Sequence, residues 1–220
     1  VLNVSLGFKT PLTSILSSAL LLQIYAEKEH PLKQKIAKHA SKIEHSVRAL
    51  NNLLTSVLFF GKADENKMEY KPKKVFLTTF VKELLDTVKA GIENDVTIKA
   101  DIGSLPKTVT TDPDLLYQIL ENLLSNAVKY SKDGKEVNFK LSMENNRLLA
   151  SVSDKGIGIP KAEQGKLFDR FFRGGNVGIV EGTGLGLSIV KKCIEMLEGD
   201  ISFESEAGKG TNFHVSIPVS

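Results

Sequence analysis

Apolar residues in the first sixty positions recur at alternating steps of four and three. One run comprises Phe8, Leu12, Ile15, Ala19, Leu22 and Ala26, and the other comprises Ile36, Ala40, Ile43, Val47, Leu50, Leu54, Val57 and Gly61. This heptad pattern predicts two helices with one apolar stripe each. Between them stands Glu29-His30-Pro31, where proline disfavours helix in the preceding residue. A hairpin cannot bury both stripes alone, so we expect two copies to form a homodimeric four-helix bundle.

The pattern changes after the second run. Residues 63–74 are polar and contain Pro72, which predicts a linker. Short strands are then expected at 74–77, 96–102, 108–110, 135–143, 147–153, 201–204 and 212–219, with helices at 79–89, from Asp112 to Ser131, and up to Glu198 before Gly199. Asp112 and Pro113 are typical of an N-cap and a first helical turn. The fold class predicted is α+β: a helical hairpin over 1–62, then an α/β sandwich over 75–220 with helices on one face of a mixed sheet.

Composition and charge exclude some functions. The formal net charge is +3 and the basic residues are scattered, so no nucleic-acid partner is expected. The single cysteine, Cys193, lies among apolar residues, where a buried packing role and a reducing compartment are expected. No apolar run approaches the ~20 residues of a membrane span. We expect a cytoplasmic protein that reaches a membrane only through segments absent from this chain.

The first chemical signal is a polar helix face. Asn122 and Asn126 are four residues apart, and Lys129 and Tyr130 follow on the same side. Amide oxygens are hard ligands for magnesium, and a lysine ammonium suits phosphate. Taken alone, this face is more simply a solvated helix surface.

Two glycine-rich segments add to this signal. Asp154 ends a predicted strand and can accept a hydrogen bond from an exocyclic amine such as that of adenine, while Gly156 and Gly158 let the backbone approach a ring. Gly182-Thr183-Gly184-Leu185-Gly186 precedes a helix, where backbone N–H groups can face phosphate. A dinucleotide-binding fingerprint would need a glycine at Leu187 and a βαβ unit, and neither is present. The three segments together predict a nucleotide site.

Their order resembles the ATP-binding superfamily of gyrase-type topoisomerases, heat-shock chaperones, mismatch-repair ATPases and histidine kinases. Residues 122–131, 154–158, 168–172 and 182–186 resemble the N, G1, F and G2 boxes of histidine kinases. The resemblance implies a site for ATP and magnesium in which Asn122 and Asn126 help to hold the metal. It also implies that Asp154 reads adenine, that Lys129 and Tyr130 meet the phosphates, and that residues 173–183 form a mobile lid.

The start of the first helix resembles the H box of that family, S-H-E-[FL]-[RK]-T-P-L. Residues 5–12, SLGFKTPL, agree with it at six of eight positions. Leu6 stands where the phosphoacceptor histidine belongs, and Gly7 stands where an acidic residue would take its proton. Leucine has no nucleophilic atom and glycine cannot act as a base, so self-phosphorylation at this position is chemically excluded. Surface or packing roles are expected for the remaining histidines, which are His30, His39, His45 and His214.

The register makes Leu6 unusual. With Phe8 and Leu12 in the seam, Leu6 should point outward, as should Leu20, Leu21 and Phe59, with Phe60 beside it. Apolar residues on an outer face indicate a contact surface or a redesign, and a natural or an engineered origin both fit.

The resemblance implies the core of a two-component sensor histidine kinase, a phosphotransferase family. In intact relatives the phosphoryl group passes from ATP to histidine and then to the receiver domain of a response regulator. Thr10 is implied as a phosphatase residue. One alternative is a non-catalytic dimeric scaffold or ligand-binding bundle that carries the ATP-binding domain as a passenger. Another is an ATPase of the chaperone or topoisomerase kind, which the hairpin and the H-box remnant disfavour.

Overall fold

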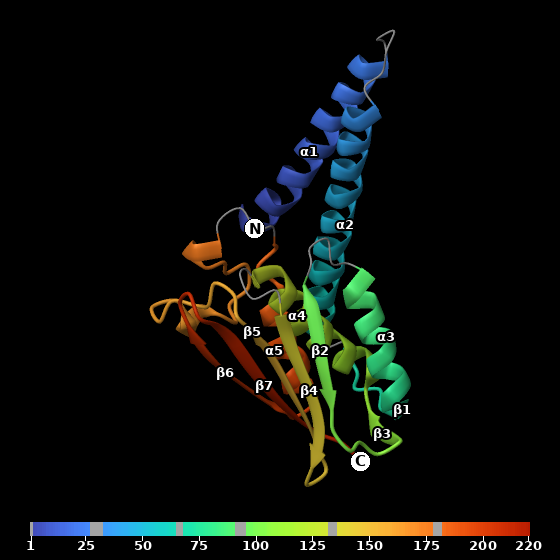
Figure 1. Ribbon diagram of the computed structural model, residues 1–220, viewed down its shortest axis with the longest axis vertical. Helices are drawn as coiled ribbons and strands as arrows, with labels where there is room; N and C mark the ends of the chain where they lie inside the picture. The colour runs from blue at the N-terminus through green and yellow to red at the C-terminus, as the bar shows by residue number, and fades with distance from the viewer. Residues whose placement is uncertain (1, 27–32, 65–67, 91–95, 132–135, 178–181) are drawn as a thin grey trace. The chain divides into compact units, whose positions relative to one another are not determined.

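The computed structural model describes residues 2–26, 33–64, 68–90, 96–131, 136–177 and 182–220 (Figure 1). Within this range the chain forms two compact units, Val1–Lys67 and Met68–Ser220. The turn expected at Glu29-His30-Pro31 and residues 178–181 of the predicted lid lie outside the described residues. The side chains of Leu6 and Gly7 also lie outside them, although both residues belong to the first helix.

The first unit is a helical hairpin. Helix α1 (Leu2–Ala26) packs against helix α2 (Lys33–Asp64), as the heptads predicted. Within one hairpin Leu12 is 54% exposed, whereas the small residues Ser18 and Ser46 are buried. Small side chains let two helices approach closely, since the interaxial distance depends on the residues at the contact. Leu12 is thus not covered within a single hairpin, and its burial in the seam of a dimeric bundle stays a prediction.

A second apolar face remains uncovered on this hairpin. Half or nearly half of each of its side chains is exposed; they are Leu12, Leu16, Leu20 and Ile24 on α1 and Val47, Leu54 and Leu58 on α2. We call these seven residues the outer apolar face. The outer apolar face thus combines three residues of the heptad stripes, Leu12, Val47 and Leu54, with apolar neighbours outside them, and it can meet a partner.

Phe60 is buried and does not lie on an outer surface. It is 7% exposed, and its ring meets that of the half-buried Phe59 edge to face, with centroids 5.6 Å apart. Ala63, one turn later, is also buried. The expectation of an outward Phe60 is wrong, because its ring packs edge to face on Phe59 and is withdrawn from solvent.

The second unit is an α/β sandwich. Strands β1 (Lys73–Phe76) and β3 (Thr108–Thr111) form a two-stranded antiparallel sheet. A five-stranded sheet has the order β2-β4-β5-β7-β6 and the bounds Thr97–Ile102, Glu136–Glu144, Arg147–Asp154, Gly210–Pro218 and Asp200–Glu206. Only β2 and β4 are parallel within it, so the sheet is mixed as predicted. The helices of this unit are α3 (Leu77–Ala90), α4 (Pro113–Tyr130) and α5 (Gly186–Met196).

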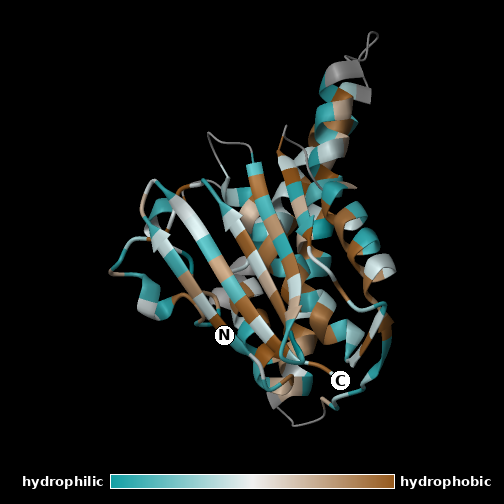
Figure 2. Cartoon of the chain, turned by 60° about the horizontal axis from the view of Figure 1, so that its bottom comes forward, coloured by the Kyte–Doolittle hydropathy of each residue, from teal (hydrophilic) through white to brown (hydrophobic). Residues whose placement is uncertain are grey.

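Alternation along the strands decides which face the helices cover. On β5, Leu148, Ala150 and Val152 are buried, whereas the intervening residues are only half-buried. Helix α4 packs against β4 and β5 through its buried leucines. The other face carries Ser151, Asn212 and His214, and Figure 2 shows the strands in front of the helices with polar bands along them. One apolar and one polar face per strand is what a sheet covered on one side requires.

Helix α4 begins as the sequence predicted. Oδ1 of Asp112 accepts hydrogen bonds from the N–H groups of Asp114 (3.0 Å) and Leu115 (3.2 Å). Oδ2 of Asp112 accepts from the N–H of Lys71 at 2.8 Å. A single buried cap thus starts the helix and holds the residues that precede β1.

Helix α5 ends earlier than predicted, at Met196. Glu198 adopts the left-handed conformation, with φ 52°, and Gly199 donates to the carbonyl of Ile194 at 2.9 Å. The C-terminal turn therefore uses Glu198 as its left-handed residue. Cys193 on this helix is fully buried, and burial raises its pKa to about 12, so it is a packing residue as expected. Among the described residues, no helix is both long and apolar enough to cross a membrane.

Candidate nucleotide-binding site

The asparagines of α4 lie against the start of α5. Nδ2 of Asn122 donates to the carbonyl of Gln118 at 2.7 Å, which orients Oδ1 away from the helix backbone. That oxygen would lie 2.7 Å from a Cβ atom placed on Gly186, and Nδ2 of Asn126 would lie 3.8 Å from it. A side chain at position 186 would displace the carboxamide of Asn122, so two carboxamides and the first turn of α5 meet at one point.

Lys129 and Tyr130 lie beside the first glycine of the same turn. A Cβ atom on Gly182 would be 2.6 Å from Nζ of Lys129 and 3.7 Å from the hydroxyl of Tyr130. Burial raises the pKa of Tyr130, and the positive charge of Arg173 opposes this effect. The site therefore holds a charged ammonium and a protonated phenol next to a glycine turn.

The loop after β5 contacts the end of α4. The N–H of Ile157 donates to the carbonyl of Tyr130 at 3.2 Å, and a Cβ atom on Gly156 would collide with that carbonyl oxygen. Asp154 is 8% exposed, and its Oδ1 accepts from the N–H of Gly156 at 2.7 Å. Burial raises the pKa of Asp154, and backbone hydrogen bonds from Gly156 and Thr211 oppose it. A carboxylate has about four acceptor positions, so Asp154 retains room for a ligand donor.

The aromatic segment 168–172 holds the glycine turn in place. The N–H of Phe171 donates to the carbonyl of Gly184 at 2.9 Å. Phe171 and Gly184 both have positive φ, 63° and 69°, and a Cβ atom on Gly184 would lie 2.6 Å from the carbonyl of Phe172. Residues held in such conformations cluster at functional sites.

In the glycine turn 182–186, Thr183 contributes its side chain and Leu185 contributes its backbone. Oγ1 of Thr183 accepts from the N–H of Leu185 at 3.2 Å, which tightens the turn. The side chain of Leu185 is fully buried, so only its backbone can face a ligand. Leu185 is the N-cap of α5 and provides no side-chain cap, so the first N–H groups of this helix are open to an anion.

Magnesium fits the oxygen donors of this site. Within the described ranges there is no group of three or more His, Cys, Asp or Glu residues that could hold a metal ion. A bound magnesium ion takes a few protein oxygens and completes its shell with water and phosphate. The oriented Oδ1 of Asn122 suits that incomplete role, with Asn126 one turn away on the same helix face.

Three residues to which the sequence analysis gave no individual role interact with the loop after β5 or with segments beside it. The positive charge of Arg173 lowers the pKa of Tyr130, against the effect of burial. Nδ2 of Asn176 donates to the carbonyl of Gly158 at 2.9 Å, and Oε1 of Glu163 accepts from the N–H of Gly175 at 3.0 Å. Arg173 and Asn176 lie within the segment 173–183 that the resemblance implied as a lid, whereas Glu163 is signalled only by its proximity to the aromatic segment.

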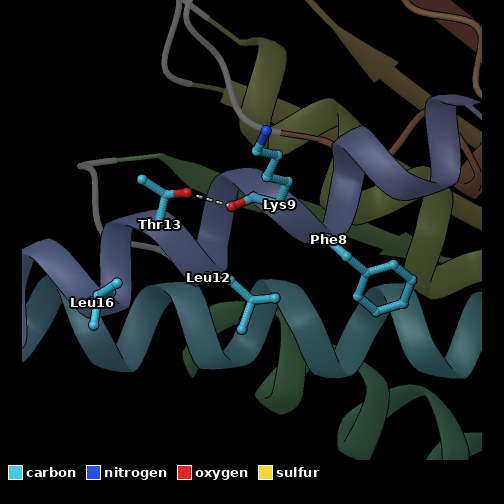
Figure 3. A pocket seen from close by; sticks show the side chains of 5 residues that line it. All are labelled: Phe8, Lys9, Leu12, Thr13 and Leu16. Atoms are coloured by element: carbon cyan, nitrogen blue, oxygen red, sulfur yellow. Dashed lines mark hydrogen bonds between the residues drawn. The ribbon is translucent and has the colours of Figure 1, made fainter.

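The H-box remnant is a separate feature on α1. Thr10 is exposed beside Pro11, which the helix tolerates in its interior. A groove of about 420 Å³ follows on this helix, lined by Phe8, Lys9, Leu12, Thr13 and Leu16 (Figure 3). The hydroxyl of Thr13 donates to the carbonyl of Lys9 at 2.9 Å. The groove lining is mostly apolar and offers a contact surface instead of a nucleophile.

The described histidines have packing or surface positions, as expected. The ring of His39 lies 5.8 Å from that of Tyr25, and His214 is hydrogen-bonded to Asn212 at 2.9 Å. His45 is exposed on α2.

Comparison with known proteins points to one family. Residues 111–220 match the family described as "Histidine kinase-, DNA gyrase B-, and HSP90-like ATPase". The chain is 32% identical over 222 residues to the sensor histidine kinase WalK of Bacillus subtilis, covering 99% of this chain and 36% of that protein. It is 36% identical over 221 residues to the autoinducer 2 sensor kinase/phosphatase LuxQ of Vibrio vulnificus, covering 96% of this chain and 25% of that protein. The chain thus spans only about a quarter to a third of these two relatives.

Solved structures confirm the fold class. The histidine kinase AdeS of Acinetobacter baumannii superposes with a TM-score of 0.69 at 20% identity, covering 96% of this chain and 95% of that one. ShkA, solved in complex with AMPPNP, gives 0.69 at 24% identity over 97% of this chain and 44% of that one. Both similarities extend through the hairpin and the sandwich.

Proposed function

The chain belongs to the histidine kinase-, DNA gyrase B- and HSP90-like ATPase family, and on this premise we propose that it is a sensor histidine kinase core that binds Mg-ATP without a phosphoacceptor of its own. The contact of the α4 asparagines with the glycine turn before α5 carries this proposal. Calorimetry with Mg-ATP tests it, with binding expected in the micromolar to millimolar range, about −4 to −8 kcal/mol. Absence of binding to the folded protein would contradict it.

Each part of the site has a role toward the nucleotide. Asn122 and Asn126 would hold the magnesium ion, which neutralises phosphate charge when bound. Lys129 and the backbone of residues 182–186 would bind the phosphates. Asp154 would accept a hydrogen bond from the amine of adenine. Its carboxylate is buried and is held by the N–H of Gly156, where the loop backbone can come close to a ring.

Tyr130 adds a donor to the phosphate side of the site. Burial raises the pKa of Tyr130, so the phenol stays protonated at neutral pH and can donate to a phosphate oxygen. Arg173 places a positive charge near the same hydroxyl, which favours an anionic ligand there.

Leu6 replaces the phosphoacceptor histidine and Gly7 replaces its acidic neighbour, so only activities that need neither residue remain. Without a nucleophile or a base there, the γ-phosphoryl group cannot be stored on this chain in the usual way. The remaining activities are ATP binding, removal of phosphate from the receiver domain of a response regulator with the help of the exposed Thr10, and transfer to another acceptor. We place the chain as a homodimer in the cytoplasmic part of a sensor, assembled through the outer apolar face.

A dimeric scaffold is the second candidate. The outer apolar face and the replaced H box both favour it, because neither needs phosphoryl transfer. Turnover of a phosphorylated receiver domain would separate the two candidates, since a scaffold that only carries the ATP-binding domain would show none.

Replacing Asp154 by Asn should weaken ATP binding by about 10- to 100-fold, because a hydrogen bond to a charged group is lost. The ratio of ATP to GTP affinity should fall with it, since the change removes an acceptor for the amine of adenine. Calorimetry of Asp154→Asn measures both. Asp101→Asn makes the same chemical change at an exposed position of β2 and should bind like the parent. Equal affinities in the two variants would exclude Asp154 from adenine recognition.

The affinity should also depend on pH. Burial raises the pKa of Asp154, so this carboxyl takes up its proton at a higher pH than an exposed aspartate, whose pKa is about 3.9. The protonated form lacks the charge that strengthens the bond from adenine. ADP affinity should therefore fall as the pH is lowered toward that pKa, and the fall should be smaller in Asp154→Asn. Parallel pH profiles for parent and variant would contradict this.

A further inference from the structure

Side-chain amides hold three consecutive carbonyls of the loop after Asp154. Nδ2 of Asn176 donates to the carbonyl of Gly158 at 2.9 Å and approaches that of Ile157 at 3.4 Å. Nε2 of Gln164 donates to the carbonyl of Ile159 at 3.1 Å. We call residues 156–159 the adenine loop, because they follow the proposed adenine acceptor.

One side of the adenine loop is anchored to the sheet. Gln164 also donates to the carbonyl of Ser205 on β6 at 3.0 Å, and the N–H of Ile159 donates to Oγ of Ser205 at 2.8 Å. The N–H of Gly208 donates to the carbonyl of Ile157 at 2.8 Å. The partners in these bonds are Gln164, Ser205 of β6 and Gly208 in the turn after β6, all outside the segment that follows the aromatic residues.

Asn176 anchors the loop from the other side. It belongs to the short 3-10 helix Gly175–Val177, which follows the aromatic segment and lies outside the sheet. Oε1 of Glu163 accepts from the N–H of Gly175 at 3.0 Å and so orients this turn. Nδ2 of Asn176 thus joins its turn to the adenine loop, and the bond from Gly175 ties the same turn to Glu163, just after that loop.

We propose that Asn176, oriented by Glu163, is a positioning residue for adenine recognition. The inference rests on the proposed ATP binding and deepens it. A glycine-rich loop has more backbone freedom to lose when a ligand orders it. Asn176 removes part of that freedom before binding, and preorganisation of this kind raises affinity. Because the loop carries Gly156, whose N–H holds Oδ1 of Asp154, the benefit falls on the adenine end of the ligand.

Calorimetry of Asn176→Ala with ADP, ATP and GTP tests this role. The dissociation constants for ADP and ATP should rise by the same factor, about three- to tenfold for one lost hydrogen bond, and the preference for ATP over GTP should fall. Lys129→Ala serves as the contrast, because a phosphate-directed residue should affect ATP more than ADP. Asn52→Ala removes the same side chain from an exposed position on α2 and should leave all three affinities unchanged.

Hydrogen exchange without nucleotide gives an independent measurement. In Asn176→Ala the amides of Ile157 and Ile159 should exchange faster than in the parent, while the unfolding temperature stays similar. Glu163→Ala, which leaves Asn176 present, should show a smaller change in the same direction. Unchanged ADP affinity and unchanged exchange in Asn176→Ala would overturn the inference. A folded parent that binds no adenine nucleotide would instead refute the proposed function.

Discussion

The double variant Leu6→His/Gly7→Glu should incorporate acid-labile phosphate from γ-labelled ATP, whereas the parent should incorporate none at this position. Leu6→His supplies a nucleophile, and Gly7→Glu supplies a base for its proton. General acid–base help typically contributes about 10²- to 10⁴-fold, so the double variant should label faster than Leu6→His alone by about that factor. Gly7→Glu also removes a helix glycine, which costs about 1 kcal/mol relative to alanine.

Two control variants test whether the label depends on the restored histidine and on ATP binding. Gly7→Glu alone should remain unlabelled, because it has no nucleophile. Adding Asp154→Asn to the double variant should slow labelling in proportion to the loss of ATP affinity. Acid-labile label on His39 or His45 of the parent would contradict the account of the missing acceptor. Silence in the double variant with ATP bound would favour the scaffold function.

Leu54→Asp should dissociate the proposed dimer. In a single chain Leu54 is 50% exposed, so the hairpin itself can place a charge there in water. In a symmetric dimer the same change puts two unpaired charges into one interface, because each copy contributes the same patch. Leaving a buried charge uncompensated costs about 3–5 kcal/mol, so the dimer dissociation constant should rise by at least about 10²-fold.

Sedimentation or light scattering at tens of micromolar protein measures this effect as a change in mass. Thr55→Asp adds the same charge at the next residue, which is exposed about a quarter turn away, and should remain dimeric. Leu50 is half-buried within the hairpin, so a charge there would weaken the single chain as well and would not isolate the interface. A monomeric parent, or a dimeric Leu54→Asp variant, would contradict the role of the outer apolar face.

Much of the fold follows from local rules that a sequence carries by itself. Asp112 followed by Pro113 marks a helix start, because the cap and the restricted φ act within one turn. Alternation along β5 separates a buried from an exposed face for the same local reason, since successive side chains point to opposite sides. The missing chemistry at Leu6 is also a property of the sequence, because no fold can give leucine a nucleophilic atom.

Only the tertiary structure decided which part of the heptad stripe on α1 and α2 lies inside the hairpin. In the single hairpin Ser18 and Ser46 are buried, whereas Leu12 of the stripe is exposed. Periodicity defines a stripe but not the neighbour that covers each part of it. Small residues at the contact set that choice through the distance between the helices.

The partners of the adenine loop were likewise decided by tertiary structure. Asn176 and Gly158 are separated by a loop, a 3-10 turn and the aromatic segment, and no periodicity links them. Glu163 meets Gly175 across the same connection. Sequence motifs predicted the ends of strands and helices where polar groups gather, because those positions follow from local backbone geometry. The bonds that hold these groups in register depend on the path of the chain between them, which only folding determines.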